Sequence, residues 1–67
     1  MKYNLKFKEI DEVRESENEN ITIKDVLNEL GLSSQTIVAK QNGELTIDES
    51  PINEGDEIQL VQIIYGG

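Results

Sequence analysis

A single short segment with a helical pattern lies among segments with strand patterns, and this constrains the fold more than any other feature of the chain. Between Ile21 and Gly31 the apolar side chains recur at helical spacing and form one stripe, which consists of Ile23, Val26, Leu27 and Leu30. Thr22 is a good N-cap residue, and Gly31 suits the left-handed position at a helix C-terminus. Since one helix can cover only one face of a sheet, we predict an α+β fold in which a small sheet packs on this helix.

The first twenty residues indicate a hairpin. Residues Met1–Glu9 alternate between apolar and polar side chains, which is typical of a half-buried strand. Residues Ile10–Asn20 are strongly acidic, and Val13 is their only apolar residue after Ile10. We predict a turn near Ile10–Glu12 and then a short polar edge strand, whose charges discourage aggregation. The lysines of the first strand form either an ordinary solvated face or a local docking spot in an acidic surface.

The C-terminal half indicates three more strands. Residues Thr36–Ile47 read as a hairpin, and Asn42-Gly43 fits a tight type I′ turn within it. In the loop that follows, we expect Ile52 to contact the core. Glu54-Gly55-Asp56 is a turn signal. The last strand is predicted to span Glu57–Tyr65.

This last strand carries apolar residues on both faces, as expected at the centre of a sheet. One face has Ile58, Leu60 and Ile64, and the other has Val61, Ile63 and Tyr65. Because the helix covers one face only, the second set is either buried under a loop or exposed to solvent or a partner. Exposed apolar clusters on small proteins often mark interaction sites.

The composition excludes several classes of function. The chain has 67 residues, enough for one domain spanning residues 1–67, and it has neither cysteine nor histidine. It therefore cannot build a Ser-His or Cys-His catalytic pair or a thiolate metal site, and we predict a protein that is not an enzyme and binds no metal. The formal net charge of −8 disfavours nucleic acids and anionic membranes, and suits either a basic protein partner or plain solubility. Without a membrane span or signal-peptide pattern, we expect a cytoplasmic protein.

The sequence closes with Gly66-Gly67. Two glycines leave no side chain beside the terminal α-carboxylate, so this end fits a narrow slot in which a partner enzyme activates the carboxylate. We therefore predict a protein that is itself a substrate, with Gly67 as its reactive residue. The alternative is an ordinary frayed end.

Four segments carry a resemblance to a known family: Ile23–Leu27, Val38–Gly43, Glu54–Ile58 and Val61–Gly67. With the predicted order of elements, they resemble the ubiquitin-like β-grasp family. Within it, the chain is most similar to the small sulfur carriers of the ThiS and MoaD type and to the archaeal ubiquitin-like small modifier proteins. The resemblance implies a mixed sheet of four to five strands on one helix, with the first and last strands paired in parallel at its centre.

The resemblance also implies a reaction at the chain end. A ubiquitin-activating-like adenylyltransferase would use ATP and Mg²⁺ to convert the Gly67 carboxylate to an acyl-adenylate, with no cofactor bound to the carrier itself. A persulfide on another protein would then supply sulfur and leave a thiocarboxylate at Gly67. Gly66 would keep the end unhindered, while Val61, Ile63 and Tyr65 would seat the last strand against the activating enzyme.

Three functions are compatible with this pattern. A sulfur carrier would serve thiamin, molybdopterin or tRNA thiolation, with a cofactor synthase as a further partner in some of these pathways. A protein modifier would instead be conjugated through Gly67 to target lysines. A non-covalent binding module would use the surface around Val61 and Ile63, with incidental glycines. In each case we expect a monomer with transient partners.

Overall fold

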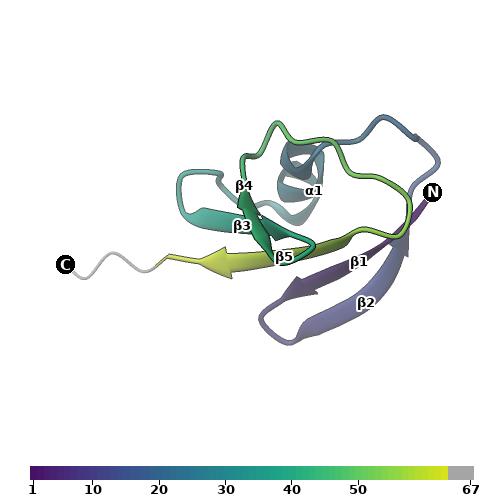
Figure 1. Cartoon of the computed structure of the whole chain (residues 1–67). Coiled ribbons are helices and arrows are strands. Elements are labelled where there is room, and N and C mark those ends of the chain that lie inside the picture. Colours follow the sequence, from purple (N-terminus) through teal and green to yellow (C-terminus); the bar gives the residue numbers. More distant parts are fainter. Residues whose placement is uncertain (64–67) are drawn as a thin grey trace.

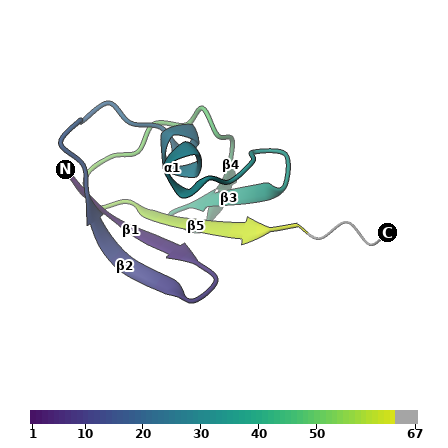
Figure 2. The same ribbon diagram turned by 180° about the vertical axis from the view of Figure 1, so that it is seen from behind.

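The computed structural model describes residues 1–63 and consists of a five-stranded sheet with one helix packed on one face (Figures 1 and 2). The elements in chain order are β1 (Lys2–Phe7), β2 (Ile10–Glu15), α1 (Ile23–Leu30), β3 (Ile37–Gln41), β4 (Glu44–Thr46) and β5 (Glu57–Gln62). The strand order is β2-β1-β5-β3-β4, in which β1 and β5 are parallel and the other neighbouring pairs are antiparallel. The predicted α+β fold with a mixed sheet on one helix is confirmed.

Helix α1 forms where its local signals place it. Thr22 and Asp25 form a reciprocal capping box, and Gly31 adopts the left-handed conformation at φ 72°. The first two helical N–H groups, those of Ile23 and Lys24, donate to carbonyl oxygens of Ser50 and Asp48 at 3.1 and 2.8 Å. The loop between β4 and β5 therefore satisfies the start of the helix, where no intrahelical acceptor exists.

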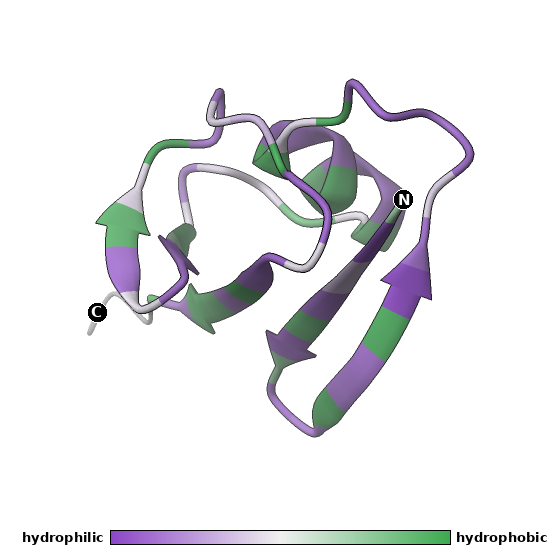
Figure 3. Cartoon of the chain, turned by 45° about the vertical axis from the view of Figure 1, so that its right-hand side comes forward, coloured by the Kyte–Doolittle hydropathy of each residue, from purple (hydrophilic) through white to green (hydrophobic). Residues whose placement is uncertain are grey.

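The core lies between α1 and the sheet face that it covers. Polar and apolar bands alternate along much of the strands (Figure 3), and the buried apolar side chains of β1, β3 and β5 point to the side of α1. The buried apolar residues are Tyr3, Leu5, Ile23, Val26, Leu27, Ile37, Ala39, Ile52, Ile58 and Leu60. The prediction that Ile52 contacts the core is confirmed, since it is 1% exposed.

The N-terminal hairpin turns earlier than the sequence predicts. Phe7 pairs with Ile10, so the turn consists of Lys8 and Glu9, and the predicted turn near Ile10–Glu12 is wrong. Lys8 has a φ of 53°, in the left-handed region that a lysine seldom occupies. The usual Gly or Asn signal is missing here, which is why the sequence pattern misplaces the turn.

The C-terminal strands follow the predicted order. Asn42 and Gly43 both have positive φ, at 54° and 86°, as the type I′ turn requires. Within the described residues the final strand ends at Gln62, which pairs with Ile37, the first residue of its partner β3. The predicted end at Tyr65 lies outside the described residues. The central position predicted for this strand is confirmed, since β5 lies between β1 and β3.

Candidate functional site

The candidate site begins at the end of β5, the central strand that leads into residues 64–67. The predicted site residues Tyr65, Gly66 and Gly67 lie outside the described residues. Val61 and Ile63 lie within them. Ile63 follows the strand, and its N–H donates to the Thr36 carbonyl oxygen at 2.8 Å, so the backbone is anchored up to this residue.

Val61 and Ile63 are exposed, with 42% and 38% of their surfaces accessible. This finding excludes the alternative that a loop among residues 1–63 buries them. Val61 pairs directly with Val38 of β3, so the two side chains share the sheet face away from α1. Their role in binding a partner stays a prediction.

Further apolar surface surrounds this pair. Leu45 of β4 is 70% exposed and pairs with Lys40, which lies two residues from Val38 along β3 and therefore on the same face. Val38, Leu45, Val61 and Ile63 are called the distal patch below. Its residues come from β3, β4 and β5 and the residue after β5, on the face opposite to the one on which α1 packs; Figures 1 and 2 show these strands and the helix.

The lysines of β1 do not form a free basic spot. The Nζ of Lys6 lies 2.7 Å from a carboxylate oxygen of Glu57, and this hydrogen bond together with the negative charge of Glu57 raises the pKa of Lys6. Lys8 lies in the turn, with its Nζ 5.4 Å from the centre of the Phe7 ring. This geometry favours the interpretation of the β1 lysines as an ordinary solvated face.

A polar cluster around Asp56, which the sequence did not reveal, fixes the start of β5. The Asp56 carboxylate accepts hydrogen bonds from Gln41 Nε2 at 2.7 Å, Asn42 Nδ2 at 3.0 Å and the Asn53 N–H at 2.8 Å. Burial of this carboxylate by itself raises its pKa, but the bonds from Asn42, Asn53 and Gln41 outweigh burial and lower the pKa of Asp56. Asp56 thus ties the β3–β4 turn to β5; Gly-Asp in the sequence indicated only a turn.

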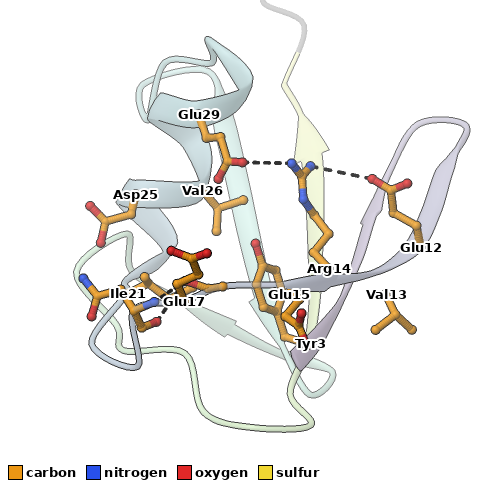
Figure 4. A pocket seen from close by; sticks show the side chains of 12 residues that line it. Tyr3, Glu12, Val13, Arg14, Glu15, Glu17, Ile21, Asp25, Val26 and Glu29 are labelled. Carbon is orange, nitrogen blue, oxygen red and sulfur yellow. Dashed lines mark hydrogen bonds and ion pairs between the residues drawn. The ribbon is translucent and has the colours of Figure 1, made fainter. Parts of the chain in front are cut away.

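A cleft of about 550 Å³ between β2 and α1 was also missed (Figure 4). Tyr3 and Val26 line its floor, and burial raises the pKa of the Tyr3 hydroxyl. Arg14 extends from β2 across the cleft to Glu29 of α1, with 3.0 Å between Nη2 and Oε1. The sequence pattern does not reveal the cleft, because β2 and α1 form its walls only once the helix packs on the sheet.

Two absences hold for the part of the chain that the structure describes. Within residues 1–63, no three His, Cys, Asp or Glu side chains gather closely enough to hold a metal ion. The same residues contain no helix with the length and apolar character needed to cross a membrane.

Comparison with known proteins gives the family. The model of the ThiS family matches residues 1–67. This chain belongs to the ThiS family. The sulfur carrier protein TtuB of Thermus thermophilus is 38% identical to this ThiS-family chain over 48 residues, which are 72% of the chain and 74% of TtuB.

Solved structures agree with this assignment. The thiamine biosynthesis protein ThiS of Geobacter metallireducens superimposes with a TM-score of 0.73 at 18% identity, over 100% of both chains. SAMP1 of Haloferax volcanii gives a TM-score of 0.67 at 19% identity, covering 98% of this chain and 97% of SAMP1. At these identities the likeness establishes the fold, and the predicted ubiquitin-like β-grasp is confirmed.

Proposed function

We propose that this ThiS-family protein is a cytoplasmic sulfur carrier that holds sulfur as a thiocarboxylate on Gly67. The observation that carries the proposal is the match of the ThiS family model to residues 1–67, a stretch that includes Gly66-Gly67. TtuB, a relative of 38% identity, is itself a sulfur carrier protein. A chain without cysteine has no thiol of its own to carry sulfur, and a terminal acyl group fills that need.

The proposed chemistry has three balanced steps. The Gly67 carboxylate attacks the α-phosphorus of ATP on a ubiquitin-activating-like adenylyltransferase with Mg²⁺, which releases pyrophosphate and forms the acyl-adenylate. The terminal sulfur of a protein persulfide then attacks the acyl carbon, and AMP leaves. Finally, a thiol attacks the resulting sulfur–sulfur bond, which frees the thiocarboxylate and leaves a disulfide. Gly66 matters because a side chain there would obstruct the approach to the acyl carbon.

The distal patch fits the role of docking this end on the adenylyltransferase. Val61 and Ile63 are exposed apolar residues immediately before residues 64–67, and exposed apolar patches are typical of protein interfaces. In the proposal, Val61, Ile63 and Tyr65 hold β5 against the enzyme while Gly66 and Gly67 enter its active site. The carrier then delivers sulfur in thiamin, molybdopterin or tRNA thiolation.

Intact-mass measurement of the protein purified from its native cells tests the proposal. A carrier ending at Gly67 should show a second species about 16 Da heavier, because sulfur has replaced one carboxylate oxygen. A Gly67→Ala variant expressed beside it should fold equally well and lack the heavier species. Absence of the heavier species from the unaltered protein under all growth conditions would contradict sulfur carriage.

The same cells test the alternative of a protein modifier. If an amine attacks the activated carboxyl group, target lysines will carry an isopeptide-linked remnant of the Gly67 end. Finding such remnants and no thiocarboxylate would show that the protein is a modifier and not a sulfur carrier. If neither product is found and the protein keeps full activity after deletion of Gly66-Gly67, it acts as a non-covalent binding module.

A further inference from the structure

The outer edge of β2 presents backbone groups that point away from the sheet. The amino group of Met1 donates to the Ser16 carbonyl oxygen at 3.0 Å, and the Ser16 N–H donates back to the Met1 carbonyl oxygen at 2.8 Å. Hydrogen-bonded pairs alternate along an antiparallel ladder, so the register assigns the inward bonds of β2 to Ile10, Glu12 and Arg14. The N–H and C=O groups of the intervening Asp11, Val13 and Glu15 point outward. Among residues 1–63, no strand lies beyond β2.

The cleft between β2 and α1 lies directly beside this edge (Figure 4). Its walls are Arg14 and Glu12 from β2 and Glu29 from α1, with 3.7 Å between Arg14 Nη1 and Glu12 Oε1. Side chains of neighbouring paired residues share a face. A strand added to β2 would therefore direct every second side chain into the cleft and the others towards the side of Val13.

Charge determines which side chains fit. Four acidic residues and one basic residue give the cleft a formal charge of −3: Glu12, Glu17, Asp25 and Glu29 against Arg14. Glu15 also borders the cleft, but by register its side chain shares the face of Val13. Arg14 is already paired with Glu29 at 3.0 Å, so it leaves the cleft negative. On the opposite side, Val13 is 63% exposed and lies between Asp11 and Glu15.

We propose that the β2 edge binds an extended basic segment of a partner protein as an added strand. Main-chain hydrogen bonds to Asp11, Val13 and Glu15 hold the segment, its Lys or Arg side chains enter the cleft, and an apolar side chain packs on Val13. The site does not depend on the proposed sulfur chemistry, since it lies at the edge of the sheet opposite to β4 and is separated from the strands of the distal patch by β1. The competing role of the acidic edge is to prevent sheet-to-sheet aggregation.

The test titrates the ¹⁵N-labelled protein with the peptide acetyl-(Lys-Val)₄-amide at low salt and follows the amide resonances. Binding should be saturable, with the largest shifts at Asp11, Val13 and Glu15 and along α1. A matched peptide that is N-methylated at every residue keeps every charge but has no residue N–H left to donate main-chain bonds. It should bind at least tenfold more weakly. Equal binding of the two peptides would reduce the effect to non-specific charge attraction and overturn the proposal.

Two sets of variants locate the site. Val13→Pro removes an outward N–H but no bond to β1, and proline is tolerated on edge strands. This variant should bind the unmethylated peptide at least tenfold more weakly. If this variant does not fold, the methylated peptide still decides the question.

Charge substitutions test the cleft itself. The double variant Glu12→Gln, Glu29→Gln should weaken peptide binding severalfold. The control double variant Glu44→Gln, Glu49→Gln changes the net charge equally at exposed positions away from the cleft and should not weaken it. Equal effects of these two charge pairs would overturn the assignment to the cleft.

Discussion

At the scale of single residues, Asp56 shows how one buried carboxylate organises a loop. It is 9% exposed and accepts hydrogen bonds from Gln41 at the end of β3, from Asn42 in the β3–β4 turn and from Asn53 of its own loop. Removing the carboxylate would leave the Asn42 Nδ2 and the Asn53 N–H without this acceptor, while Gln41 Nε2 would keep its bond to the Pro51 carbonyl oxygen at 2.8 Å. An unsatisfied buried group costs more than an exposed one. The start of β5 depends on this contact.

We predict that Asp56→Asn lowers the free energy of unfolding by about 1–3 kcal/mol at pH 7. The hydrogen bonds depress the folded-state pKa of Asp56, so its contribution is complete above the unfolded pKa of about 3.9 and is lost as the pH falls through the folded value. The difference between the two proteins should therefore shrink below about pH 4. Urea unfolding from pH 7 to pH 2 measures this, with the exposed Asp11→Asn as control. A difference that is constant over this range would contradict the hydrogen-bonded carboxylate.

At the scale of elements, the sequence predicts those features whose signals are local. Thr22, Asp25 and Gly31 specify both ends of α1 within a short stretch of chain, and Asn42-Gly43 specifies the β3–β4 turn. The end of β5 could not be predicted, because it depends on where β3 begins in a distant part of the chain.

The candidate site divides in the same way. The alternation in β5 predicted that Val61 and Ile63 share a face and left open whether a loop buries it; both residues are exposed. Val38 and Leu45 join them only through strand pairing, and the β2–α1 cleft exists only after the helix packs. The other residues of each surface are brought together by the pairing of distant strands, and the pattern of a single sequence does not show this register.

Substitution in α1 tests how the helix holds the sheet. Leu27 is 2% exposed in the core, so Leu27→Ala should lower the free energy of unfolding by about 2–5 kcal/mol through the lost burial and the cavity that remains. Leu45→Ala removes the same atoms from a side chain that is 70% exposed and should change stability by less than about 0.5 kcal/mol. Chemical denaturation of both variants measures the contrast. Similar losses at the two positions would show that α1 does not bury Leu27 as described.

At the scale of the whole molecule, the two sides of the sheet differ in chemistry. One side carries α1 and, at its β2 edge, the acidic cleft. The other side carries the distal patch, in which Ile63 is the last described residue. Because β1 separates the β2 edge from the strands of the distal patch, a partner on the β2 edge leaves the distal patch open. Activation at Gly67 and recognition through β2 can then be separated by substitution.

Charge substitutions at the distal patch and at the β2 edge test whether the two surfaces act separately. Val61→Asp places a charge in the distal patch and should lower the kcat/KM for carrier-dependent pyrophosphate release by the cell's adenylyltransferase at least tenfold, equivalent to about 1.4 kcal/mol of binding free energy. Val13→Asp adds the same charge to the same sheet face at its β2 edge, on a side chain that is 63% exposed, and should leave this rate within about twofold. Thermal unfolding of both variants establishes that each is folded at the assay temperature. Equal rates for the two folded variants would show that the enzyme does not dock on the distal patch, even where Gly67 is still adenylated.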